Sequence, residues 1–245
     1  MSSGQPQVVQ HRDADDLADR GAERLLAKLI DLQADGRVAQ LCLTGGRIAL
    51  SLYARLGELV AGSELDPTRL ELWWGDERFL PTDDPERNAG PTLALLAGHF
   101  TLDSGRTHPM PSADGVVDAG ASAATYAKEL GETRFDLCLL GMGPDGHVAS
   151  IFPNHVCSEI TTQSVIGVSD APKPPAERIS LTIQALSNSE EVWFLVSGRE
   201  KASALARALA GDTELPAGRV TAQGRTLWLV DQESAAELPY FDCAM

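Results

Sequence analysis

The apolar residues of this 245-residue chain alternate between helical spacing and short continuous runs. Between Asp13 and Asp35 they recur at intervals of three and four residues, which is typical of an amphipathic helix. A continuous apolar run follows at residues 38–43, and helical spacing returns from Ile48 to Leu59. Short apolar runs bounded by glycine or polar residues indicate buried strands. The pattern therefore predicts that the chain begins with a helix, a strand and a second helix.

The same alternation continues toward the end of the chain. Further strands are predicted at residues 70–74, 135–141, 178–183, 192–196 and 226–230, and further helices near residues 88–96, 121–130 and 199–210. Strands that alternate with helices predict an α/β fold, here a mainly parallel, Rossmann-like open sheet with helices on both faces. Residues 169–175 contain three prolines, which favours a stiff surface loop. No repeat or linker is evident, so residues 1–245 are expected to form a single domain.

Polar residues follow three of the predicted strands. Thr44-Gly45-Gly46-Arg47 follows the first strand, Gly75-Asp76-Glu77-Arg78 follows the second, and Gly143-Pro144-Asp145-Gly146-His147 follows the strand that ends at Gly141. In a parallel sheet these three segments would be loops at one edge, where ligands of open α/β sheets bind. The sequence therefore predicts a functional site at that edge.

His147 is the best candidate for a catalytic base, because an imidazole exchanges protons near neutral pH. It follows a glycine turn and lies two residues after Asp145. Loops at strand ends can expose polar groups that strand interiors cannot. The alternative interpretation is a structural turn with an incidental histidine.

Residues 141–146 also match the glycine pattern of dinucleotide-binding folds. That pattern requires a long helix that begins inside the motif and holds the pyrophosphate at its N-terminus. Pro153 leaves little room for such a helix, so a nicotinamide cofactor is only a minor alternative and no cofactor is expected. The histidines and cysteines lack the spacing of metal ligands, so no metal is expected. A Gly-x-Ser-x-Gly elbow, the mark of many serine hydrolases, is also absent.

Gly45 and Gly46 are candidates for binding a phosphate. Glycines let backbone N–H groups approach a ligand, and the helix behind them presents its positive end. Lys173 and Lys201, two of only four lysines, could add donors for an anion. The alternatives are an ordinary turn, solubilising lysines and, for residues 76–78, a solvated cluster of salt bridges.

Composition excludes several kinds of partner. The formal charge of -15 argues against binding to nucleic acid or to an anionic membrane surface. No apolar stretch approaches the ~20 residues of a membrane helix, and residues 1–7 do not resemble a secretory signal. The four cysteines, which are Cys42, Cys138, Cys157 and Cys243, show no paired spacing. We interpret them as free thiols in a reducing compartment and expect a cytoplasmic protein.

Together these segments resemble the ordered motifs of the 6-phosphogluconolactonases. The resemblance rests on Thr44-Gly45-Gly46, Trp74-Gly75-Asp76-Glu77-Arg78 with Asn88, residues 141–153, Lys173-Pro174-Pro175 with Arg178, and Ser197-Gly198 with Lys201-Ala202. It extends from about the first predicted strand to the last. The family often has Ser or Thr and then Pro after its glycine pair, whereas this chain has Arg47-Ile48-Ala49. Arg47 either replaces those hydroxyl donors or points to solvent.

The resemblance implies hydrolysis of 6-phospho-D-glucono-1,5-lactone to 6-phosphogluconate in the oxidative pentose phosphate pathway, without a metal or organic cofactor. In that reaction His147 would take a proton from the attacking water, and Asp145 or Asp76 would orient its ring. Arg78 and nearby backbone N–H groups would stabilise the oxyanion. The candidates for binding the phosphate are Gly45, Gly46, Arg47, Lys173, Arg178 and Lys201.

Two other functions remain as alternatives. The related glucosamine-6-phosphate deaminases carry an acidic residue five positions after the histidine, where this chain has Phe152. A non-catalytic sugar-phosphate sensor could retain the same pocket. The expected partner in each case is a small sugar phosphate, and the sequence leaves the oligomeric state open, a monomer included.

Overall fold

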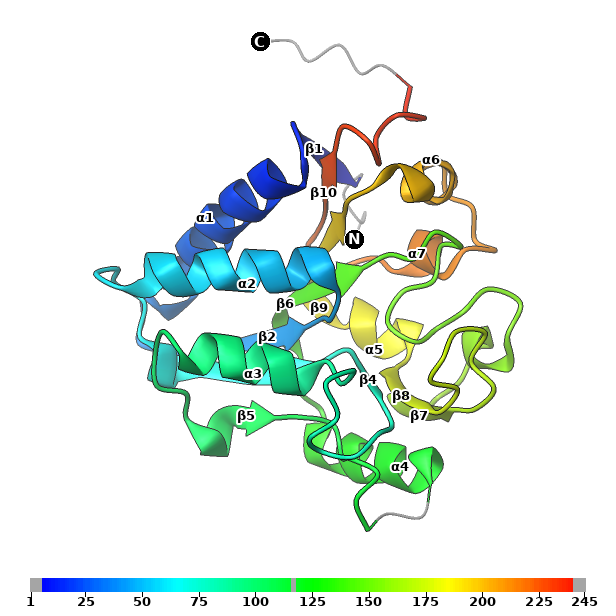
Figure 1. Ribbon diagram of the computed structural model, residues 1–245, viewed down its shortest axis with the longest axis horizontal. Coiled ribbons are helices and arrows are strands. Elements are labelled where there is room, and N and C mark those ends of the chain that lie inside the picture. The colour runs from blue at the N-terminus through cyan, green and yellow to red at the C-terminus, as the bar shows by residue number, and fades with distance from the viewer. Residues whose placement is uncertain (1–5, 116–117, 240–245) are drawn as a thin grey trace.

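The computed structural model describes residues 6–115 and 118–239 (Figure 1). Its main sheet has seven parallel strands in the order β1-β10-β9-β6-β2-β3-β5. These strands are β1 (Gln7–His11), β2 (Ala39–Leu43), β3 (Leu70–Trp74), β5 (Thr107–His108), β6 (Phe135–Gly141), β9 (Ser189–Val196) and β10 (Arg225–Asp231). A second, antiparallel sheet has the order β4-β8-β7 and consists of β4 (Asp76–Arg78), β7 (Val165–Val168) and β8 (Arg178–Leu181). The prediction of an α/β fold with a mainly parallel sheet is confirmed.

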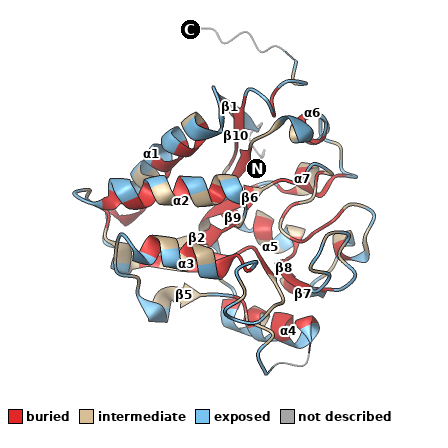
Figure 2. Ribbon diagram, in the orientation of Figure 1, coloured by how far each residue is buried: buried red, intermediate tan, exposed pale blue. Residues whose placement is uncertain are grey.

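Helices cover both faces of the main sheet. They are α1 (Ala14–Gln33), α2 (Arg47–Val60), α3 (Ala89–Ala97), α4 (Ala119–Leu130), α5 (Ile183–Ser187), α6 (Ala202–Leu209) and α7 (Pro216–Arg219). On one face, Leu229 of β10 lies close to Gly21 of α1, and Figure 1 shows α1, α2 and α3 side by side. On the other face, Trp73 of β3 packs against Tyr126 of α4. Figure 2 shows the buried strands together with helices such as α1, α2 and α4, which have both buried and exposed residues.

The order of strands reverses beside β2. From β2 the chain passes to β3 and then β5 on one side, and it returns to β6 on the other side before continuing to β9 and β10. In open α/β sheets, the crevice beyond the carboxyl ends of the strands at such a reversal is where ligands bind. The loops after β2 and β6, which contain Gly45 and His147, meet at this point.

The segment Asp76–Arg78 is a strand and not the predicted loop. It pairs antiparallel with β8, with Arg78 opposite Arg178. The sequence did not reveal this strand because its three residues are all charged and have no apolar period. Glu77 is completely buried, so the interpretation of this triplet as a solvated cluster is wrong.

Other differences follow from the second sheet and from short elements. The strand predicted at 178–183 is confirmed as β8, but it belongs to the antiparallel sheet. Strands β1, β5 and β7 and the short helices α5 and α7 were not predicted, because runs of two to five residues carry little periodic signal. Residues 169–177 form a loop between β7 and β8, as the prolines predicted.

Glu77 joins β4 to the start of α3. Its Oε1 accepts hydrogen bonds from the backbone N–H groups of Arg78 at 2.8 Å and Asn88 at 2.6 Å. Its Oε2 accepts from the N–H of Ala89 at 2.9 Å, and Arg87 Nη2 lies 3.5 Å away. Burial raises the pKa of Glu77, and these donors offset part of that effect. The carboxylate therefore satisfies N–H groups at the N-terminus of α3 that the helix itself cannot satisfy.

Two buried tyrosines hold the ends of β2 and β3. The Tyr53 hydroxyl accepts from the N–H of Thr44 and donates to its carbonyl oxygen, both at 3.1 Å. The Tyr126 hydroxyl accepts from the N–H of Trp74 at 3.0 Å and donates to the carbonyl oxygen of His108 at 3.1 Å. Two of the strand ends that precede the predicted site are thus fixed by side chains from neighbouring helices.

We expect Glu77→Gln to lower the free energy of unfolding by about 3 kcal/mol, because the amide would place an NH₂ group against backbone donors in a buried position. Urea unfolding monitored by circular dichroism measures this change. Glu64 is exposed, so Glu64→Gln serves as the control and should change the stability by less than about 0.5 kcal/mol. Equal stability of the two variants would show that Glu77 does not brace the structure.

Candidate active site

A cavity of about 450 Å³ lies beyond the carboxyl ends of β2, β3, β6 and β9. All of the site residues predicted from the sequence line it except Asp145 and Lys173, and both of these contact His147. The lining also includes residues that the sequence did not assign to the site, among them Ser51, Asn88, Ser197 and Glu200. Asn88 and Ser197 lie within the motifs that carry the resemblance. Ser51 lies on α2, and nothing in the sequence around it indicated a site residue.

The loop after β6 places the His147 ring through a tight turn. The N–H of Gly143 donates to the carbonyl oxygen of His147, and the N–H of Gly146 donates to that of Gly143, both at 3.0 Å. A Cβ at Gly143 would lie 2.1 Å from the imidazole ring, which is far too close. Gly146 has a φ of +80°, a conformation that favours glycine. The glycines of this motif therefore let the ring fold back over its own turn.

Asp145 holds the imidazole of His147. The Asp145 Oδ1 and His147 Nδ1 atoms are 2.5 Å apart. Burial alone would raise the pKa of Asp145, but the hydrogen bond and the charges of His147 and Lys173 together lower it well below its usual range. Because an ionised carboxylate can only accept, Nδ1 carries the proton in this pair. The Nε2 atom is then the nitrogen with a free lone pair.

Asp76 has different partners. Its Oδ2 accepts from the Ser150 hydroxyl at 2.7 Å, and its Oδ1 accepts from Asn88 Nδ2 at 3.2 Å. Among the described residues it makes no hydrogen bond to His147. Of the two carboxylates that the sequence offered for orienting the ring, Asp145 is therefore the one in contact with it. Asp76 is a buried acceptor fixed on the cavity wall.

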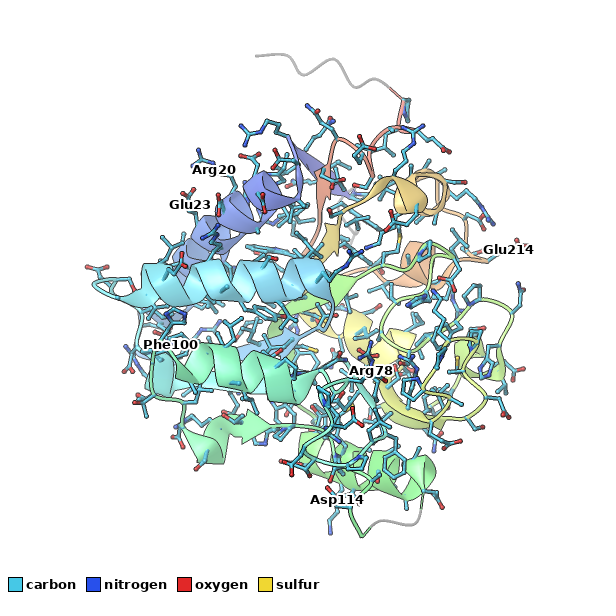
Figure 3. All side chains as sticks on the ribbon, viewed as in Figure 1. Arg20, Glu23, Arg78, Phe100, Asp114 and Glu214 are labelled. Atoms are coloured by element: carbon cyan, nitrogen blue, oxygen red, sulfur yellow. The ribbon has the colours of Figure 1, made fainter. Side chains whose placement is uncertain are left out.

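Arg78 and Arg178 lie opposite each other on β4 and β8. The Arg78 guanidinium donates to the carbonyl oxygen of Glu86, and the side chain lines the cavity. In Figure 3 it lies near the middle of the molecule, whereas Arg20 and Glu23 lie on the outer side of α1. One guanidinium nitrogen of Arg78, Nη1, is thus bonded to the loop before α3, while its buried Nε has no hydrogen-bond partner among the described residues.

Arg178 is largely committed to the proline loop. Its Nε donates to the carbonyl oxygen of Pro175 at 3.1 Å, and its Nη2 donates to those of Lys173 and Pro174 at 3.2 and 3.1 Å. Burial lowers the pKa of Arg178, the Asp76 carboxylate raises it, and the charge of Arg78 lowers it. Nη1 lies 3.5 Å from the Ser150 hydroxyl. Few donors therefore remain for the phosphate contact predicted for this residue.

The glycine pair forms the opposite wall, where α2 begins. A Cβ at Gly45 would lie 1.9 Å from Asn88 Oδ1, and Gly46 has a φ of +100°, so each position requires glycine for a separate reason. No side chain caps the N-terminus of α2. Its first N–H groups, together with the positive end of the helix dipole, are available to an anion.

Cations gather beside this uncapped helix. Burial lowers the pKa of Lys201, Glu200 and Asp231 raise it, and Arg47 and Lys173 lower it. Arg47 and Lys173 are therefore close enough to Lys201 for their charges to act on it. Arg47 lines the cavity although its side chain is exposed. The structure thus places Arg47 and Lys201 together at the end of the cavity where α2 begins.

Residues 6–115 and 118–239 contain no group of three or more His, Cys, Asp or Glu side chains arranged to hold a metal ion. Their cysteines, Cys42, Cys138 and Cys157, are buried free thiols, and Cys243 lies outside the described residues. Within the same part of the chain, no helix has both the length and the apolar character needed to cross a bilayer.

Comparison with known proteins identifies relatives of the whole chain. The 6-phosphogluconolactonase of Streptomyces coelicolor is 45% identical over 97% of this chain and 96% of its own length. That of Mycobacterium tuberculosis is 37% identical over 93% and 96%. The crystal structure of the 6-phosphogluconolactonase from Thermotoga maritima covers 92% of this chain and 99% of its own, with a TM-score of 0.82 and 29% identity.

The fold is shared more widely than the activity. A monomeric glucosamine-6-phosphate deaminase covers 94% of this chain and 99% of its own, with a TM-score of 0.78 and 23% identity, which shows the fold alone. The model of the family described as glucosamine-6-phosphate isomerases/6-phosphogluconolactonase matches residues 12–228. This chain belongs to the glucosamine-6-phosphate isomerase/6-phosphogluconolactonase family.

Proposed function

We propose that this chain hydrolyses 6-phospho-D-glucono-1,5-lactone to 6-phosphogluconate in the oxidative pentose phosphate pathway. Relatives that match nearly the full length of the chain are 6-phosphogluconolactonases. The observation that carries the proposal is the pairing of His147 with an ionised Asp145 in a cavity that also contains Arg78 and an uncapped helix N-terminus. Such a cavity offers a base, a donor for an oxyanion and a site for a phosphate.

The reaction begins when the free Nε2 of His147 accepts a proton from water as that water attacks the lactone carbonyl carbon. Asp145 stabilises the imidazolium that forms, through the 2.5 Å hydrogen bond to Nδ1. Arg78 donates to the oxyanion of the tetrahedral intermediate. When the intermediate collapses, the bond to the ring oxygen breaks and the imidazolium returns its proton to that oxygen. Ring opening restores the neutral base and leaves a carboxylic acid, which loses its proton to solvent to give the carboxylate of the product.

The phosphate binds at the other end of the cavity in this proposal. The N–H groups at the start of α2 approach it across the glycine pair, and Arg47 and Lys201 neutralise its charge. Charge-assisted hydrogen bonds of this kind are about twice as strong as neutral ones. Binding energy from this remote group then holds the carbonyl carbon against the base.

The deaminase alternative is opposed by Phe152. This residue stands where the deaminases have their additional acid, and it is fully buried with its ring 4.8 Å from the His147 ring. A lactonase needs only one proton carrier, whereas the aldose–ketose chemistry of the deaminases uses that acid. The decisive assay generates the lactone in situ and compares hydrolysis with the spontaneous rate. Release of ammonia from glucosamine 6-phosphate would instead support the deaminase, and an unchanged lactone decay would support a sensor.

We expect His147→Ala to fold normally and to lose at least ~100-fold in kcat, the effect of removing a positioned general base. The assay is hydrolysis of the phosphorylated lactone after subtraction of the spontaneous reaction. His99 is exposed and does not line the cavity, so His99→Ala serves as the control and should keep the wild-type rate. A His147→Ala protein with more than half the wild-type kcat would exclude this residue as the base.

Arg78→Lys should lower kcat by on the order of 100-fold with a smaller effect on KM, because a point charge does not reproduce a planar fork of donors at the oxyanion. The exposed Arg24, on the outer side of α1, provides the matched control in Arg24→Lys. A change confined to KM would contradict oxyanion stabilisation and would assign Arg78 to substrate binding.

Lys201→Ala should lower kcat/KM for the phosphorylated lactone by about 10- to 100-fold and leave the low rate on unphosphorylated gluconolactone nearly unchanged. Arg47→Ala tested in the same way shows whether this arginine replaces the hydroxyls usual in the family. Lys128 is exposed on α4, so Lys128→Ala should affect neither substrate. Equal losses on both lactones would mean that Lys201 does not bind the phosphate.

A further inference from the structure

Lys173 contacts the catalytic pair and does not line the cavity. Its Nζ lies 3.2 Å from Asp145 Oδ1 and 3.3 Å from His147 Nδ1. It therefore contacts the ring at Nδ1, the nitrogen that is already bonded to Asp145. The sequence predicted Lys173 as a phosphate ligand, but the structure places its ammonium against Asp145 and Nδ1 of His147.

The loop that carries Lys173 is held rigidly to the same wall. Arg178, which is buried, donates to the carbonyl oxygens of Lys173 and of the two prolines that follow it. The Arg178 guanidinium also lies 5.7 Å from the centre of the Phe152 ring, which itself packs against His147. The backbone of Lys173 is therefore fixed relative to the imidazole it approaches.

The charge of Lys173 opposes the effect of Asp145 on the base. A carboxylate next to an imidazole favours the protonated ring, and a protonated ring cannot accept a proton from water. A positive charge at 3.3 Å favours the neutral ring instead. Because Nδ1 already donates to Asp145, Lys173 acts on the ring through its charge and on Asp145 through a hydrogen bond.

We propose that Lys173 is a positioning residue for the base: its ammonium holds Asp145 against Nδ1 and keeps His147 neutral at physiological pH. This inference rests on the proposed function, since it assumes that His147 accepts a proton from water. Lys173 and Lys201 then have different roles, since Lys201 remains a candidate ligand at the phosphate end of the cavity.

Other charged groups face the ring from a greater distance. Those that line the cavity are Asp15 on α1, Arg47 on α2, Asp76 and Arg78 on β4, Arg178 on β8, and Glu200 and Lys201 after β9. Among the described residues, none of these makes a hydrogen bond or ion pair with His147, whereas Asp145 and Lys173 both lie within 3.3 Å of Nδ1. These two groups are therefore the charged side chains in direct contact with the imidazole.

The test is Lys173→Met, which removes the charge and keeps an unbranched stem. The pH dependence of kcat/KM is measured for the phosphorylated lactone and for gluconolactone, with the spontaneous rates subtracted. We expect the acid limb of both profiles to move about one pH unit upward, which is a loss of about 10-fold near pH 6 that largely recovers near pH 8. Lys173→Arg should restore most of the wild-type profile, and Lys128→Met should leave it unchanged.

Lys201→Met provides the contrast, since it should impair only the phosphorylated substrate and leave the pH dependence in place. If Lys173→Met instead behaves like Lys201→Met, Lys173 is a phosphate ligand and the inference is wrong. A loss that is equal at every pH and is not rescued by arginine would reduce Lys173 to a structural role and would overturn it as well.

A second readout does not depend on activity. The His147 ring can be titrated by NMR, with its signals assigned by comparison with His147→Ala. Lys173→Met should shift that titration to higher pH, and an unshifted titration would contradict the inference. A wild-type protein without lactonase activity would refute the proposed function, whereas the NMR result would still report whether Lys173 controls the charge of the ring.

Discussion

The buried carboxylate of Glu77 is the constraint on which the geometry of the cavity depends. It fixes the backbone at Arg78 on β4 and at Asn88 before α3. The Asn88 side chain in turn donates to Asp76 and occupies the space that a Cβ at Gly45 would need. One carboxylate thus sets the positions of Arg78, a buried acceptor and the glycine turn. Because these groups come from three separate elements, no local interaction could align them.

The net charge of the chain is negative, whereas cations gather in the cavity. The short range of screened charges explains how the two can coexist in one molecule. A chain of formal charge -15 repels anions at long range, but screening limits that repulsion to about 8–10 Å at ordinary ionic strength. Within the cavity, Arg47 and Lys201 stand beside an uncapped helix N-terminus. A small dianion would therefore meet favourable charges at short range, while the remaining surface disfavours larger polyanions.

The sequence predicted the main strands and the loops after β2 and β6, because continuous apolar runs and glycine turns are local signals. It could not show that Asp76–Arg78 is a strand, since this segment is stabilised by pairing with residues a hundred positions later. The direction of Lys173 was equally hidden, because it depends on hydrogen bonds from Arg178 to the carbonyl oxygens of the proline loop. Residue types indicated which side chains would gather at one edge of the sheet, but only the fold shows which of them contact His147 and which lie near the start of α2.

Phe152 shapes the environment of the proposed base, His147. Its buried ring packs against His147 and under the Arg178 guanidinium, and it supports the imidazole without adding a charge. A carboxylate at this position would be a second negative charge beside the ring and would favour the imidazolium. It would therefore act in the same direction as Asp145 and against Lys173. The apolar residue thus leaves a single carboxylate and a single ammonium in contact with the imidazole, which are the two charges that the proposed role of Lys173 sets against each other.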